Sequence, residues 1–168
     1  MEDSRAAELE RLVRAYGDDL MRISFVCLKD LHLAQDAVQD AFLKAFRRLR
    51  DIQDREEPVK KAWLIRIAVN TCRDYRRSAW QRWVDRRIRP EELPETAQAA
   101  PEDHTDVLSE VMRLPLPLRQ VIVMAYYQDM DADAASRALG ISRASFYRRL
   151  KKARETLKLH AERWVSDD

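Results

Sequence analysis

The sequence predicts an all-α protein made of two small helical domains joined by a flexible linker. Only two glycines occur in 168 residues, too few for the tight turns of an all-β fold or for a glycine-rich phosphate loop. Ala, Leu, Arg, Glu and Gln, which are good helix formers, dominate the composition. A polar, proline-containing stretch separates two groups of amphipathic segments, which indicates two domains rather than one.

The first domain is predicted at residues 1–84 and begins with two amphipathic helices. The first helix places these residues on one face: Leu9, Leu12, Val13, Tyr16, Leu20, Ile23 and Cys27. The second face is formed by Leu33, Ala37, Ala41, Ala45 and Leu49, and is widened by Val38, Phe42 and Phe46. Steps of three and four residues are typical of helices that bury one face.

A polar segment, Asp51–Lys61, interrupts this pattern and contains Pro58, so it is predicted to be a loop. A third helix is expected to start near Val59. Its apolar face would consist of Leu64, Ile67, Ala68, Thr71 and Tyr75. Three helices of this size can share one core, in which Trp63 is expected to pack. Trp80 and Trp83 are expected beyond the helix, where they would either stack on bases or pack against the protein.

Residues 85–106 are predicted to form the linker. The part from Arg89 to Asp106 holds three prolines, several acids and almost no large apolar side chain. Such a segment cannot bury enough apolar surface to form a core.

The second domain is predicted at residues 107–168. Its first short apolar face consists of Val107, Leu108, Val111, Met112 and Leu114, and ends at Pro115 and Pro117. The next face consists of Leu118, Val121, Ile122 and Ala125. Two short helices are expected here, ahead of the most informative segment of the chain.

That segment, Asp131–Lys152, predicts a helix-turn-helix. Ala135, Ala138 and Leu139 would give a short helix a small, close-packing face. Gly140 follows at the point where a helix end favours a left-handed residue. After the apolar link Ile141, Ser142 is well placed to cap the next helix.

The second helix of this motif has two unlike faces. Its apolar face would consist of Phe146, Leu150, Ala153 and Leu157, and its other face of Arg143, Tyr147, Arg148, Lys151 and Lys152. In a helix-turn-helix this second helix enters the major groove of DNA. The alternatives are a helical hairpin with a basic solvated face and, for Tyr147, packing against the first helix instead of contact with a base.

The net charge is only +2, but the basic residues are concentrated in two stretches. Seven arginines and two aspartates occur in residues 73–89, and six basic residues without an acid occur in residues 143–154. Either stretch alone would normally be read as a solvated helix face. Together, on an otherwise balanced chain, they indicate two contacts with a polyanion.

Several classes of protein are disfavoured by the residue pattern. Cys27, Cys72 and the three histidines are scattered, so we expect buried thiols and neither a metal site nor a cofactor. The sequence contains no motif that would bring together the acid, the base and the nucleophile that an enzyme needs, so no catalytic activity is expected. The first twenty residues are charged and apolar runs stay short, so we expect a cytoplasmic protein without a signal peptide or membrane insertion.

Four segments, in order, resemble the extracytoplasmic-function sigma factors of bacterial RNA polymerase. AQDAVQDAFLKAFRRL, from Ala34, is similar to the polymerase-binding helix of sigma region two, and KAWLIRIAVNTCRDYRR, from Lys61, to its promoter-melting helix. LPLPLRQVIVMAYYQDM, from Leu114, and ALGISRASFYRRLKKAR, from Ala138, are similar to region four and its helix-turn-helix. The chain departs from the family where Ala134, Ala144 and Arg148 replace its usual Ile, Gly and Ser.

The resemblance implies three functional surfaces. Asp36, Gln39 and Asp40, which share a stripe with Leu43, would dock on the coiled coil of the polymerase β′ subunit; without the resemblance this stripe reads as a solvated face. Asn70 and the loop at 51–61 would recognise an extruded base of the minus-ten element, while Arg73, Arg76 and Arg77 follow the single-strand backbone. The minus-thirty-five element would be contacted by Ser145, Tyr147, Arg148, Lys151 and Lys152.

The partners implied are core RNA polymerase, through its β′ coiled coil and β flap, promoter DNA, and a dedicated anti-sigma factor. A stand-alone DNA-binding regulator is the first rival hypothesis, but residues 1–84 would then have to be a ligand or dimerisation domain. A small helical enzyme is the second.

Overall fold

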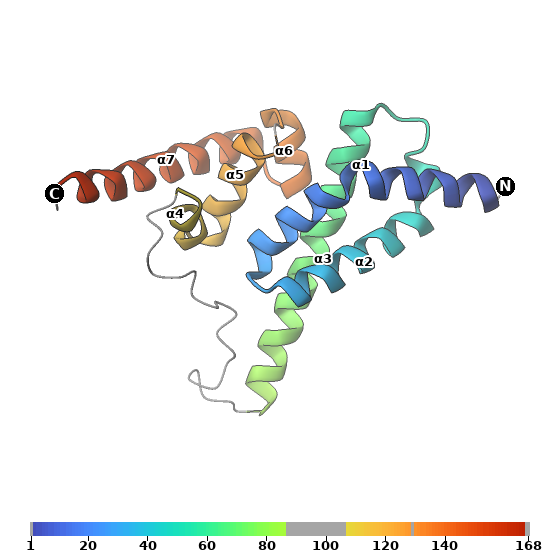
Figure 1. Cartoon of the computed structure of the whole chain (residues 1–168), viewed down its shortest axis with the longest axis horizontal. Helices are drawn as coiled ribbons and strands as arrows, with labels where there is room; N and C mark the ends of the chain where they lie inside the picture. The colour runs from blue at the N-terminus through green and yellow to red at the C-terminus, as the bar shows by residue number, and fades with distance from the viewer. Residues whose placement is uncertain (1, 87–106, 129, 167–168) are drawn as a thin grey trace. The chain divides into compact units, whose positions relative to one another are not determined.

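The computed structural model describes residues 2–86, 107–128 and 130–166. Its contacts divide the chain into two compact units, one in each half of the sequence, and each is considered by itself. All regular secondary structure in the described residues is helical, which confirms the predicted all-α class. Figure 1 shows the helices of both units.

The first unit is a bundle of α1 (Glu2–Leu28), α2 (Leu31–Arg47) and α3 (Glu57–Arg86), each in contact with the other two (Figure 1). The core is formed by Leu12, Leu20 and Ile23 of α1, Ala37, Ala41 and Ala45 of α2, and Leu64, Ile65 and Ala68 of α3. The alanines of α2 let its neighbours approach closely. Val13 departs from the predicted apolar face, since 41% of it is exposed.

A tight turn separates α1 from α2. Lys29 adopts a left-handed backbone with φ of 55°. Asp30 then caps α2, because its Oδ1 accepts a hydrogen bond from the Leu33 amide at 3.0 Å. The cap satisfies one of the amides that a helix start leaves unpaired.

The loop predicted at Asp51–Lys61 is shorter than expected. A 3₁₀ turn at Leu49–Asp51 precedes it, and α3 begins at Glu57, so Pro58 belongs to the helix. In the first turn of a helix a proline costs no hydrogen bond and its fixed φ is helical, so it starts α3 rather than interrupting it. Residues 52–56 form the remaining connection, which we call the specificity loop.

The other end of α3 also differs from the prediction. The helix continues to Arg86, so Trp80 and Trp83 lie within it and not beyond it. Trp80 is 61% exposed, and Trp63 is half-buried rather than fully packed in the core. The helix runs two residues past the predicted domain end at residue 84. The rest of the predicted linker, residues 87–106, lies outside the described residues, and the domain boundaries stay a prediction.

Both cysteines are free and buried, as predicted. The fold places them in contact, although 44 residues separate them in sequence. A hydrogen bond between their thiols, together with burial, raises the pKa of Cys72. Both cysteines therefore belong to the core of the first unit, at the contact between α1 and α3.

The second unit contains α4 (Val107–Arg113), α5 (Leu116–Tyr126), α6 (Ala132–Leu139) and α7 (Arg143–Ser166). The last helix contacts the other three (Figure 1). Pro115 occupies the N-cap position of α5, without a side-chain hydrogen bond, and Pro117 lies in its first turn, so these prolines separate α4 from α5. The core comprises Val111, Leu114, Leu118, Val121, Ile122, Ala135, Ala138, Leu139, Phe146, Leu150 and Ala153.

Candidate nucleic-acid interface

The junction between α6 and α7 has the geometry of a helix-turn-helix. Asp131 caps α6 by accepting a hydrogen bond from the Ala134 amide at 2.8 Å. Gly140 ends α6 in the left-handed region, with φ of 67°. Ser142 caps α7, since its Oγ accepts from the Ser145 amide at 3.1 Å. The turn residue and this second cap were both predicted from the sequence.

The exposed side of α7 carries most of the predicted minus-thirty-five residues. Arg148, Lys151 and Lys152 are exposed, and so is Tyr147, at 53% of its surface. Ser145 is half-buried, and its Oγ accepts a hydrogen bond from the Arg148 guanidinium at 2.9 Å. We call these five residues the recognition surface. Its basic side chains present donors that match phosphates and guanine edges.

Two arginines that flank the recognition surface, Arg143 and Arg154, are oriented by side chains of the preceding helices. The Arg143 guanidinium forms an ion pair with Asp133 of α6, at 3.1 Å. A hydrogen bond with Tyr147, and then the charge of Asp133, raise the pKa of Arg143. Arg154 donates to the Tyr126 hydroxyl of α5 at 2.7 Å, and its guanidinium lies over that ring. These contacts tie α7 to both preceding helices.

The aromatic ring of Tyr147 contacts the ring of its neighbour Phe146. Its ring meets Phe146 edge-on, with centroids 5.8 Å apart. Phe146 is buried, whereas Tyr147 stays mostly exposed. Contact of Tyr147 with a base stays a prediction.

The exposed side of α3 carries the predicted minus-ten residues, which we call the melting surface. Asn70, Arg73, Arg76 and Arg77 are all exposed. The buried Thr71 and Cys72 lie on the opposite side of the helix. An exposed amide beside three guanidinium groups suits a base and its phosphate backbone.

The predicted polymerase-binding residues lie on α2, and we call them the docking stripe. Asp36 and Gln39 are exposed, and Asp40 is half-buried. The Tyr75 hydroxyl of α3 donates a hydrogen bond to the Asp40 carboxylate. Burial, and then this bond, raise the pKa of Tyr75 to about 12. Asp40 therefore already holds a partner within the protein, which its position in the sequence did not reveal.

A second contact joins the same two helices. The Lys44 ammonium of α2 donates to Thr71 Oγ1 at 3.1 Å and lies 3.6 Å from the Asp74 carboxylate. Asp74, an acid within the basic stretch of α3, is paired in this way. The docking stripe and the melting surface thus lie on two helices that are joined by hydrogen bonds and an ion pair between polar side chains.

The part of the chain that the structure describes contains no cluster of three His, Cys, Asp or Glu side chains placed to hold a metal ion. Nor does any helix in it combine the length and apolar character needed to cross a membrane. The three surfaces themselves present charged groups, amides and an exposed aromatic ring.

Family models match both units of the chain. Sigma-70 region 2 matches residues 12–82, and Sigma-70 region 4 matches residues 104–157. The RNA polymerase sigma-E factor of Streptomyces coelicolor is 30% identical over 161 residues, which cover 89% of this chain and 86% of that protein. The chain belongs to the extracytoplasmic-function sigma factors.

Other relatives agree with this assignment. The sigma factor SigM of Bacillus subtilis, itself of the extracytoplasmic-function class, is 27% identical and covers 95% of this chain and 99% of its own length. The matched regions account for both structural units of this sigma factor. Its function is to direct RNA polymerase to specific promoters at initiation. Sigma factors as a family are generally not catalytic.

Solved structures with the same fold span nearly the whole chain. The sigma factor RpoE, in a complex with the anti-sigma factor NepR from Bartonella quintana, superposes with a TM-score of 0.73 at 19% identity, covering 92% of this chain and 97% of that one. CnrH, in a complex with the cytosolic domain of CnrY, gives 0.65 at 26% identity, covering 94% and 89%.

Proposed function

We propose that this sigma factor reads its promoter through two surfaces and binds polymerase through a third. The recognition surface on α7 would contact the minus-thirty-five element in the major groove. The melting surface on α3, with the specificity loop, would hold an extruded base of the minus-ten element. The docking stripe on α2 would bind the β′ coiled coil, and the second unit the β flap.

The observation that carries this proposal is the capped, two-faced α7. The apolar face of α7 is buried against the other helices of the second unit. Its exposed face presents Tyr147, Arg148, Lys151 and Lys152. Since the Gly140 turn and the Ser142 cap set where α7 begins, the exposed donors lie within its first three turns. That is the part of a recognition helix that reaches base edges.

The docking stripe suits an arginine-bearing partner helix. Exposed carboxylate and amide groups at Asp36 and Gln39 can form charge-assisted hydrogen bonds with it, which set the register of the contact. The half-buried Asp40 would share its carboxylate between Tyr75 and the polymerase.

We further propose that the protein acts in the cytoplasm, where bacterial RNA polymerase lies, and that it contributes recognition rather than catalysis. The sigma factor RpoE, which has the same fold, has been solved in a complex with the anti-sigma factor NepR. A dedicated inhibitor of that kind would regulate this one by covering the surfaces that polymerase needs.

DNA binding by the full chain tests the recognition surface. Arg148→Ala and Lys152→Ala should each weaken binding to a duplex promoter and lower the salt slope by about one unit per lost phosphate contact. Lys158→Ala, an exposed lysine farther along α7, is the matched control. If all three variants bind alike in a salt titration, the recognition surface is wrongly assigned.

A further inference from the structure

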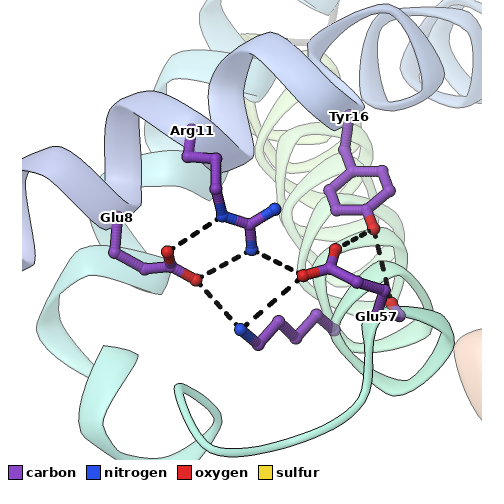
Figure 2. A network of polar contacts seen from close by, with 5 residues as sticks. Glu8, Arg11, Tyr16 and Glu57 are labelled. Carbon is purple, nitrogen blue, oxygen red and sulfur yellow. Dashed lines mark hydrogen bonds and ion pairs between the residues drawn. The ribbon is translucent and has the colours of Figure 1, made fainter.

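Five side chains form a closed polar network where α1 meets the start of α3 (Figure 2). Arg11 of α1 holds Glu8 with two hydrogen bonds of 2.9 Å and Glu57 of α3 with one of 2.7 Å. The Lys60 ammonium lies 3.0 Å from Glu8 and 3.8 Å from Glu57. The Tyr16 hydroxyl donates to the other oxygen of the Glu57 carboxylate.

Charge in the network is balanced and partly shielded from water. Two carboxylates face two cations, and 9% of the Lys60 side chain is exposed. An ammonium in that position requires counter-ions. A hydrogen bond from Arg11, opposed by burial and reinforced by Lys60, lowers the pKa of Glu8 from 4.5 to about 2. Glu8 therefore remains a carboxylate at neutral pH.

The polar network is not the only link between α1 and α3. The two helices are in contact, and both contribute buried apolar side chains such as Leu12 and Leu64 to the core. About half of the Glu57 side chain is exposed, at 51%, and Arg11 is 42% exposed. A partly exposed pair such as Arg11–Glu57 contributes little to global stability, so its effect should be on local geometry. The Lys60–Glu8 pair is more buried.

What the network fixes is one end of the specificity loop. Glu57 is the first residue of α3, directly after the loop, and Tyr16 and Arg11 hold its carboxylate. The other end is fixed by buried Ile52, whose amide donates to the Leu49 carbonyl at 3.2 Å. Between the two anchors the side chains at 53–56 are exposed.

We propose that Glu8, Arg11, Tyr16, Glu57 and Lys60 are positioning residues that hold the specificity loop in one conformation, and so set base selectivity at the minus-ten element. This inference rests on the proposed role of the loop and α3 in binding an extruded base. None of the five touches the base; they act through the loop. Rigid support of this kind is what a site that reads a single base requires.

The test uses the full chain with core RNA polymerase and a pool of promoters randomised across the minus-ten and minus-thirty-five elements. Glu57→Gln and Tyr16→Phe preserve size and remove one link each. Glu10→Gln is the matched control, because Glu10 lies on the same helix and pairs only loosely with Arg14, at 3.8 Å with a 71% exposed side chain.

Both network variants should reduce selectivity at one or two minus-ten positions by about threefold. They should speed hydrogen exchange of the loop amides by a similar, about threefold, factor. Selectivity at the minus-thirty-five element and the thermal unfolding temperature should match those of Glu10→Gln. If both variants behave like the control, or lose selectivity equally at both elements together with thermal stability, the positioning role is overturned.

Asp54→Ala and Asn70→Ala separate this inference from the function it rests on. If these two change minus-ten selectivity while the network variants do not, only the positioning role fails. If they too leave minus-ten selectivity unchanged, the loop and α3 do not read the base, and the proposed melting surface fails with it.

Discussion

Asn70 is the residue at which a structural and a DNA-binding role differ most clearly. A buried amide that loses its partner leaves another group unsatisfied and destabilises the fold. Asn70 is exposed, beside Arg73 and Arg77, on the side of α3 that faces away from the core. Its side chain is therefore available for contact with nucleic acid and is not required by the packing of the bundle.

Asn70→Ala should accordingly leave the thermal unfolding temperature and the affinity for core polymerase nearly unchanged. Strand opening should fall, because the extruded base loses its contact, and a pre-melted promoter bubble should restore transcription only in part. Permanganate footprinting beside thermal unfolding makes the measurement. Normal opening and normal transcription by the variant would rule out the proposed role of Asn70.

Long-range pairs at the residue scale could not be predicted from the sequence. The Tyr75–Asp40 bond, the Lys44–Thr71 bond and the contact between Cys27 and Cys72 each join residues far apart in the chain. Helical periodicity shows which face of a helix is buried, but not which residue of another helix it meets. Tyr75 was expected on the apolar face, and its hydroxyl reaches the docking stripe from there.

At the scale of elements, the two glycines of the chain occupy opposite environments. Gly140 ends α6 with a left-handed φ of 67°, and a β-carbon there would meet nothing within 4 Å. Gly17 lies inside α1, where a β-carbon would make an ordinary contact of 4.0 Å with Val13. Only the first position needs the conformational freedom of glycine.

Gly140→Ala should therefore lower the free energy of unfolding of the second unit by about 1–2 kcal/mol, the cost of a left-handed backbone in other residues. Gly17→Ala should raise that of the first unit by about 0.5–1 kcal/mol, because alanine favours a helix interior. Urea unfolding followed by circular dichroism compares the two. Stabilisation by both substitutions would contradict the left-handed turn of the helix-turn-helix.

The ends of helices could be predicted where they depend on residues close together in the sequence. Gly140 and Ser142 act within one turn of the chain, and their roles followed from residue type and position. The sequence predicts a loop at Pro58, because a proline that interrupts a helix and one that starts it look alike without the neighbouring fold. The sequence predicts Trp80 beyond the third helix, because the polar and charged residues around it hide how far α3 continues.

At the scale of the whole molecule, each unit carries one of the surfaces that we propose to contact nucleic acid. The first unit carries the docking stripe on α2 and the melting surface on α3, and hydrogen bonds join these two helices. The second unit carries the recognition surface. The matches to region 2 and region 4 cover the same two units. This division accounts for the two basic stretches of a chain whose net charge is only +2.

We expect this chain to give core RNA polymerase its promoter specificity through these three surfaces. Run-off transcription on the randomised promoter pool, with core polymerase of the source organism and purified full-length chain, tests it most directly. The chain should enrich promoters with two separate conserved elements, whereas Asp36→Lys should abolish transcription while Asp18→Lys, on an exposed part of α1, should not. Transcripts without sequence enrichment, or an Asp36→Lys variant as active as Asp18→Lys, would contradict the account.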